Sequence, residues 1–284
     1  MSNTKKQLMT AIAMLVVAAL ALGTSTYAWF VSNTTVKVDE MQFTAQSVDN
    51  LQIALTTDAW QGQVDGTGAT AGTYKTLITA QDLNELYTSI GAVLTTAAIE
   101  PASTINGQTF YKIASNSADD ATTWELVNGT YTAKKFTQVA NVSENCVKAI
   151  PLFIRSTSGG ALYLKDATTV SGDAAPAARI AFVVDGATKA IWAPSAATID
   201  GRQITTVDGA DGIHKAVSNT TSVGDVANTY TDTKPTAVKF ADLTANTPVR
   251  VMVYIWLEGC DEDCVAGLSA KDLSVNLQFE SRSN

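Results

Sequence analysis

The sequence VRVMVYIWL at residues 249–257 carries the pattern that decides the fold. One face of this stretch has an aliphatic residue at every second position, namely Val249, Val251, Val253, Ile255 and Leu257. The other face carries Met252, Tyr254 and Trp256. Strict alternation predicts a β-strand, and two apolar faces predict a strand that is covered on both sides. The segment 273–279 alternates apolar with polar residues, which predicts a second strand with one wet face.

Outward from these two stretches, short strands and tight turns continue along the chain. We expect strands at residues 41–45, 51–55, 124–127, 130–132, 147–155, 180–184 and 189–192. Asn128-Gly129 and Asp185-Gly186 each separate two such runs, which predicts two-residue hairpins. Pro151 marks its strand as an edge strand or a bulge, because proline cannot donate a ladder hydrogen bond.

One stretch of the chain predicts a helix. Thr79 and Asp82 can form its capping box, and four apolar residues follow at helical spacing: Leu83, Leu86, Tyr87 and Ile90. This helix lies in an insertion at about residues 58–108, and a second insertion at about 195–235 has the Asp, Gly and Thr content of loops. Many short strands with turn signals favour one β-sandwich with two insertions. A split into two domains near residue 145 is the alternative.

The composition excludes two broad classes of protein. Of the 284 residues, 46% are hydrophobic and 16% are charged, and the formal net charge is −8. The apolar content is too high for a disordered chain. The acidic balance, with no cluster of Lys and Arg, excludes a nucleic-acid-binding protein.

The first 28 residues have the three parts of a secretory signal peptide. Lys5 and Lys6 precede an apolar run at residues 8–22, and small residues lead to Ala28. We therefore expect a signal peptide at residues 1–28 and a mature chain at 29–284. An uncleaved membrane anchor that continues through Trp29, and a pilin-type leader cut after Lys6, are the alternatives. In all three cases the bulk of the chain lies outside the cytoplasm.

The N-terminal block combines the lysine start and apolar run with GTSTYAWF at 23–30, MQFTA at 41–45 and LQIAL at 51–55. In these motifs it resembles the TasA/camelysin family, over residues 5–56 and more loosely over 249–279. The resemblance implies that a dedicated signal peptidase cuts between Ala28 and Trp29. It also implies a secreted jelly-roll protein that polymerises into extracellular matrix fibres. The expected fold is therefore mainly β, an antiparallel jelly-roll-like β-sandwich with two loop or helix insertions.

Fibre formation would need a strand that one subunit can give to the next. The segment 29–38 directly follows the predicted cut, is rich in Thr and Val and has strand propensity. We expect it to add to an open sheet edge of a neighbouring subunit, so that the protein is its own partner in a homopolymer. Trp29, Phe30, Val36 and Val38 are the candidate donor side chains. The membrane is then a partner only through the leader before cleavage.

Three cysteines allow one disulfide and leave one thiol over. Cys260 and Cys264 lie close together in the sequence and Cys146 lies far from both. The close pair could close a loop, and Cys146 with either of the others could join two strands. The sequence does not distinguish these pairings.

No catalytic or cofactor-binding motif is present in the sequence. His214 is the single histidine, and it is surrounded by turn residues, so we expect it in a surface loop. A zinc hydrolase needs more metal ligands than one histidine, and a Ser-His-Asp triad needs a nucleophilic serine positioned beside its histidine. The metalloprotease activity described for camelysin is therefore not expected here, because the chain has no His-Glu-x-x-His. Acidic loops at 208–212 and 261–263 could offer oxygens to calcium, but neither matches the twelve-residue calcium loop, and solvated turns are the favoured interpretation.

Two functions from different classes follow from these observations. The first is a secreted, non-enzymatic structural subunit of extracellular or biofilm-matrix fibres. The alternative is a membrane-anchored cell-surface adhesin or binding module that uses the two long insertions as its recognition surface.

Overall fold

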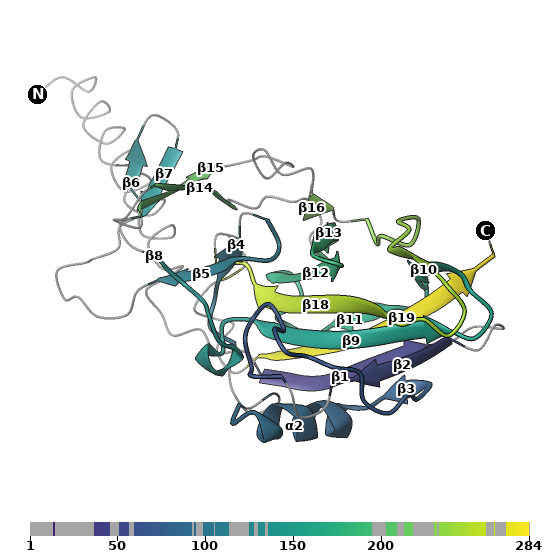
Figure 1. Cartoon of the computed structure of the whole chain (residues 1–284). Coiled ribbons are helices and arrows are strands. Elements are labelled where there is room, and N and C mark those ends of the chain that lie inside the picture. Colours follow the sequence, from purple (N-terminus) through teal and green to yellow (C-terminus); the bar gives the residue numbers. More distant parts are fainter. Residues whose placement is uncertain are drawn as a thin grey trace, which may run out of the picture.

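The computed structural model describes residue 14 and residues 37–45, 51–56, 60–92, 94, 99–104, 106–113, 125–127, 130–133, 136–194, 203–208, 213–217, 230–231, 233–259, 264 and 271–283. The fold is mainly β, as the alternating sequence patterns predict. Within these residues the strands form four sheets, of which two have six strands each (Figure 1).

The first large sheet, sheet I, contains the N-terminal and the C-terminal strands of the described chain. Its order is β17–β10–β19–β1–β3, with β11 beside β19. Its strands are β1 (Lys37–Ala45), β3 (Leu77–Ile78), β10 (Gly160–Leu164), β11 (Thr169–Ser171), β17 (Ala241–Leu243) and β19 (Asp272–Arg282).

The second large sheet, sheet II, has the quoted stretch 249–257 as an interior strand. Its order is β16–β13–β12–β18–β9–β2. Its strands are β2 (Leu51–Leu55), β9 (Lys148–Ser156), β12 (Ala178–Val184), β13 (Ala187–Trp192), β16 (Tyr230–Thr231) and β18 (Val249–Leu257). Both large sheets combine strands from before and after residue 145, which contradicts a division into two domains at that point.

Two smaller sheets complete the described strands. One has the order β4–β5–β8, with β4 (Ser103–Thr104), β5 (Phe110–Ile113) and β8 (Phe136–Gln138). The other has the order β14–β15–β7–β6, with β6 (Glu125–Val127), β7 (Thr130–Ala133), β14 (Gln203–Asp208) and β15 (Ile213–Val217). The described helices are α2 (Ala80–Ser89) and a short 3₁₀ helix, η1 (Val142–Glu144).

The large sheets are mixed, and this corrects the expectation of a purely antiparallel fold. β1 runs parallel to β19, with Lys37 opposite Asp272 and Ala45 opposite Phe279. β16 also runs parallel to β13. A short turn between neighbouring strands forces them antiparallel, whereas β1 and β19 come from opposite ends of the chain and no turn fixes their direction.

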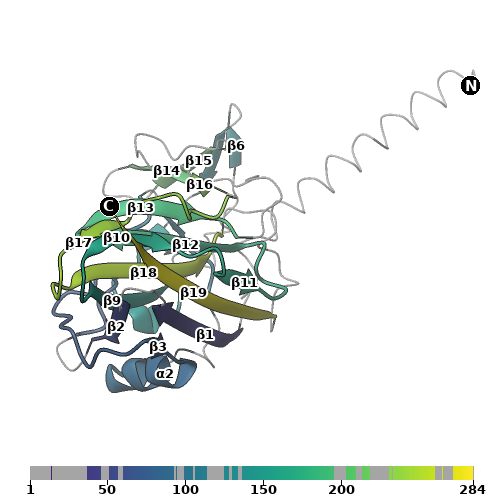
Figure 2. The same cartoon turned by 90° about the vertical axis from the view of Figure 1, so that its right-hand side faces the viewer.

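Sheets I and II face each other across one hydrophobic core (Figure 2). Phe182 of β12 stacks on Phe240 with ring centroids 4.9 Å apart, and it meets Phe279 of β19 edge-on at 6.4 Å. Since β12 belongs to sheet II and β19 to sheet I, these rings join the two layers. Each fully buried side chain of this size contributes about 1.5–3 kcal/mol.

The outer face of sheet II is also covered, which confirms the prediction that residues 249–257 are buried on both sides. The ring of Phe110 in β5 packs against the rings of Tyr254 and Trp256, with ring centroids 5.2 Å and 5.1 Å apart, respectively. Both partners belong to β18 and alternate with the residues that face sheet I. The small sheet β4–β5–β8, which begins in the first insertion, therefore forms a third layer over sheet II.

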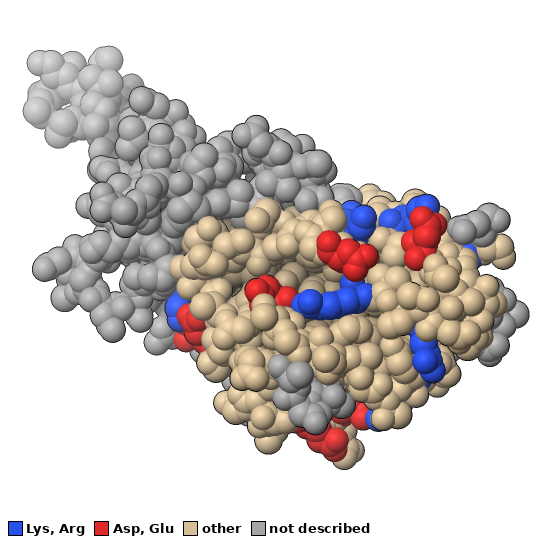
Figure 3. All heavy atoms as spheres, viewed as in Figure 1, with Lys and Arg blue, Asp and Glu red and all other residues tan. Residues whose placement is uncertain are grey.

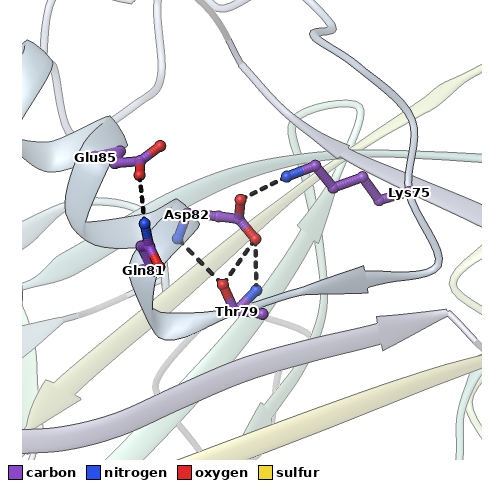
Figure 4. A network of polar contacts seen from close by, with 5 residues as sticks. All are labelled: Lys75, Thr79, Gln81, Asp82 and Glu85. Carbon is purple, nitrogen blue, oxygen red and sulfur yellow. Dashed lines mark hydrogen bonds and ion pairs between the residues drawn. The ribbon is translucent and has the colours of Figure 1, made fainter.

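Helix α2 confirms the helix predicted in this insertion (Figure 4). The Thr79 hydroxyl accepts from the Asp82 backbone N–H at 3.3 Å, and an Asp82 carboxylate oxygen accepts from the Thr79 backbone N–H at 2.8 Å. Lys75 adds an ion pair to Asp82 at 2.5 Å. The helix buries Leu83, Leu86 and Tyr87, and the Tyr87 hydroxyl donates to the Ala149 carbonyl of β9 at 3.0 Å.

Both predicted hairpins are confirmed. Val127 pairs with Thr130, and Val184 pairs with Ala187, so that two residues separate each pair of strands. Asp185 and Gly186 have φ angles of 48° and 77°, the left-handed conformation that a tight hairpin needs.

The strand at Pro151 differs from its prediction as an edge strand. β9 lies inside sheet II between β18 and β2, and Pro151 is opposite Met252. The ladder between β9 and β2 ends at the pair of Leu152 and Leu55, and Pro151 lies one residue beyond that pair. On that side β9 is locally an edge strand, although the strand as a whole is interior.

The prediction that residues 195–235 form loops is wrong in part. β14 and β15 form a hairpin there, and β15 also pairs with β7. Their Ile, Val and Thr residues favour strands. Most of the Asp and Gly residues that suggested loops, including those at 209–212, lie outside the described residues.

Candidate functional site

The predicted donor segment meets the folded body at the start of β1. We predicted that residues 29–38 form a free donor strand. Val38 pairs with Leu273 of the same chain, so Lys37 and Val38 belong to sheet I instead, and the prediction is wrong for these two residues. The parallel ladder to β19 holds them in their own subunit. Ala28, Trp29, Phe30 and Val36 lie outside the described residues.

β1 is an edge strand over its N-terminal half. On one side it pairs with β19 from Lys37 onward, and on the other side β3 pairs only with Phe43 and Thr44. Among the described residues, no second strand pairs with 37–41. The ladder has an irregularity between Val38 and Glu40. Edge strands with bulges and charges resist uncontrolled pairing, and this half of β1 contains Lys37, Asp39 and Glu40.

The other described edges of the large sheets are short or covered. β17 has three residues, and β16 and β3 have two each. The outer side of β2 is bridged by the following segment, because Ile53 exchanges backbone hydrogen bonds with Lys75 at 2.8 Å in each direction. Among the described edges of the two large sheets, the start of β1 is therefore the longest stretch without a second partner strand.

The cysteines behave as buried thiols. Cys146 and Cys264 are both buried and neither is in a disulfide, whereas Cys260 lies outside the described residues. The Cys146 sulfur lies 3.3 Å from the Glu144 carbonyl oxygen and 3.8 Å from a Glu100 carboxylate oxygen. Burial raises the pKa of Cys146 to about 12. Because reactive and metal-binding cysteines are thiolates, this protonated thiol lacks the chemistry of a nucleophile.

His214 lies in a strand and not in the loop that its neighbours in the sequence suggested. It belongs to β15, where it pairs with Val207 on one side and Ala133 on the other. Asp208 ends β14, and residues 209–212 and 261–263 of the two acidic loops lie outside the described residues. In the part of the chain that the structure describes, no group of three His, Cys, Asp or Glu side chains could hold a metal ion. No helix in that part is long and apolar enough to cross a membrane.

The structure also contains a cleft that our sequence analysis did not predict. It lies between the outer face of sheet II and the first insertion and has a volume of about 500 Å³. Its polar lining includes Gln63, Asp65, Gln138, Asp185, Arg250 and Tyr254. We call this feature the sheet II cleft. Arg250 is the sequence feature that could have indicated this cleft, because it is the one charged residue in the apolar stretch 249–257.

Arg250 is fixed in the sheet II cleft through one end of its guanidinium. Nη2 donates to the Asp65 backbone carbonyl at 2.5 Å and lies 3.4 Å from the Met252 sulfur. Nε is buried and has no hydrogen-bond partner within the described residues. Gly66 allows this close approach, because its φ is 65° and a Cβ there would lie 2.8 Å from the Met252 sulfur and overlap Arg250.

The Asp65 carboxylate is held on the same loop. Thr67 donates to it from its backbone N–H at 2.9 Å and from its hydroxyl at 2.5 Å. The hydroxyl hydrogen bond, assisted by the charge of Arg250, outweighs burial and keeps the pKa of Asp65 below its usual range. Asp65 is therefore ionised and positioned at neutral pH.

Charged side chains are sparse on the surface of the folded body. Figure 3 shows acidic and basic side chains beside one another on one face, within a mostly uncharged surface. Comparisons of the chain with protein-family models, with curated proteins and with solved structures found no match.

Proposed function

We propose that this protein is a secreted, non-enzymatic structural subunit that polymerises into extracellular fibres by N-terminal strand addition. In this proposal the leader is removed between Ala28 and Trp29, and the two facing sheets form a jelly-roll-like sandwich, as the resemblance to the TasA/camelysin family implies. The donor segment is residues 29–36, two residues shorter at its C-terminal end than the sequence alone suggested.

One observation carries the proposal. β1 and β19 begin together in a parallel ladder, with Lys37 opposite Asp272, the first residue of β19. Lys271 is not in a strand, so this ladder starts at the pair of Lys37 and Asp272. A strand-prone segment that precedes β1 in the sequence can pair with a sheet edge of another subunit, since backbone hydrogen bonds supply affinity in this mode of binding.

A proline within the donor segment tests strand addition. Val36→Pro removes a backbone N–H, whereas Val36→Thr keeps both the N–H and the strand propensity. We expect the secreted V36P chain to remain folded and monomeric and the V36T chain to form fibres, as judged by urea unfolding and negative-stain electron microscopy. Fibres of V36P as abundant as those of the parent chain would refute strand addition through this segment.

The anchored adhesin or binding module remains the second candidate, and the sheet II cleft favours it, because the first insertion forms one wall of that cleft. The intact mass of the exported protein separates the two candidates. A chain that starts at Trp29 supports the fibre subunit, and a membrane-bound chain that retains residues 1–28 supports the anchored module.

A further inference from the structure

The sheet II cleft has the size and the polar lining of a small-molecule site. Its volume of about 500 Å³ falls in the range of about 300–1,000 Å³ that is usual for ligand pockets. The floor comes from β12 and β18, which are interior strands of a rigid sheet, and one wall comes from the loop that carries Asp65. A site on such a scaffold is preorganised, because its supporting strands are fixed by ladders on both sides.

Tyr254 on the floor of the cleft has an unused hydroxyl. Its side chain is 2% exposed and its ring packs on Phe110. Burial raises the pKa of Tyr254 to about 12, so the phenol keeps its proton at neutral pH. No residue in the described part of the chain is hydrogen-bonded to this hydroxyl, which lines the cleft. The Tyr254 hydroxyl is not among the buried unpaired polar atoms of the described residues, so water in the cleft can reach it and a ligand oxygen can take the place of that water.

Around this hydroxyl the cleft offers both donors and acceptors. The amides of Gln63 and Gln138 make no hydrogen bond within the described residues, and each supplies one acceptor and two donors. Arg250 adds positive charge to the lining, although its Nε is buried. The Asp65 and Asp185 carboxylates add acceptors, and Asp185 is exposed at the tip of the β12–β13 hairpin.

This mixture distinguishes among ligand classes. Two carboxylates against one guanidinium disfavour an anion, and Arg250 together with the amide donors disfavours a simple cation. A hydroxyl group donates and accepts at once, so it can use a donor and an acceptor of the cleft simultaneously. We propose that the sheet II cleft binds a neutral, hydroxyl-rich ligand, namely a short saccharide. This inference does not rest on fibre formation, because the cleft lies within one subunit.

The test uses the full exported chain and three disaccharides as probes: cellobiose, lactose and chitobiose. Saturation-transfer NMR detects their binding, with inorganic phosphate as a competitor that represents anions. Tyr254→Phe removes only the hydroxyl, and Gln138→Ala removes one amide. Gln81→Ala on α2 is the matched control, because that amide bonds only to Glu85 at 3.0 Å on the exposed side of the helix.

We expect at least one disaccharide to bind, and we expect Y254F to weaken its affinity about tenfold, the loss that one hydrogen bond in a buried site gives. Q138A should weaken it as well, and Q81A should not. Three results would overturn the inference: no binding of any disaccharide, binding that Y254F and Q138A leave unchanged, or displacement of the bound sugar by phosphate at equal concentration. Urea unfolding of each variant confirms that it is folded.

Discussion

A lysine buried in sheet II sets a measurable pH dependence of stability. Lys148 of β9 has no exposed surface, and its ammonium lies 5.8 Å from the centre of the Tyr87 ring. Burial lowers the pKa of Lys148 from 10.5 to about 8. Below pH 8 the folded protein carries this ammonium at a cost, since the unfolded chain holds the same charge in water. Each pKa unit corresponds to about 1.4 kcal/mol, so the cost is about 3 kcal/mol.

Replacing Lys148 with methionine removes the charge and keeps the length of the side chain. We expect K148M to raise the free energy of unfolding at pH 7 by about 1–3 kcal/mol, the lower value applying if the cation–π contact with Tyr87 and the other interactions of Lys148 offset part of the cost. Between pH 8 and 10.5 the parent chain loses the Lys148 proton when folded but keeps it when unfolded. The free energy of unfolding of the parent chain therefore rises with pH over this range. The difference in free energy of unfolding between K148M and the parent chain falls toward zero.

Urea unfolding of both chains at several pH values between 6.5 and 10 measures this difference. Lys189→Met provides the control, because Lys189 is exposed on β13 and its replacement should change stability by less than about 0.5 kcal/mol. A K148M chain that is less stable than the parent at pH 7, with a difference that does not vary with pH, would refute the argument from burial.

Three further perturbations test other features of the fold. Thr79→Ala should lower stability by about 1 kcal/mol through loss of the helix cap, while Thr79→Ser should retain it; urea unfolding compares the two. Gly66→Ala should destabilise the protein more than Gly91→Ala. Both glycines have a positive φ, so each alanine carries left-handed strain of about 1–2 kcal/mol. At Gly66 the added Cβ would also overlap Arg250 and Met252, whereas at Gly91 it would meet no atom within 4 Å. Iodoacetamide at pH 8 should leave Cys146 and Cys264 unmodified in the native protein and alkylate both in urea, as read by mass spectrometry, since both thiols are buried; rapid native labelling of Cys146 would contradict its raised pKa.

The sequence was sufficient for features that depend on neighbouring residues. The alternation at 249–257 and 273–279, the Asn128-Gly129 and Asp185-Gly186 turns and the Thr79 capping box each encode their own local geometry, and the structure has all of them. Periodicity also revealed that β18 has two buried faces.

Features that join distant residues could not be predicted in the same way. The parallel pairing of β1 with β19 leaves no trace in either strand's pattern, because alternation is the same for both directions of pairing. The sheet II cleft combines Gln63, Gln138 and Arg250 from three separate segments, and only the charge at Arg250 in an apolar strand signals it. The hairpin of β14 and β15 was hidden because turn residues dominate the composition around it.

The pairing of β1 with β19 also determines when the protein can fold. Strand β1 begins at Lys37 and its partner β19 begins at Asp272, so β1 is synthesised long before β19. Non-local pairing of this kind slows folding, because a long loop must close before the ladder forms. If the chain is exported as proposed, its N-terminal segment crosses the membrane before the ladder between β1 and β19 can form. Sheet I therefore stays incomplete until β19 has been made, and β1 is fixed in place only when both strands are present.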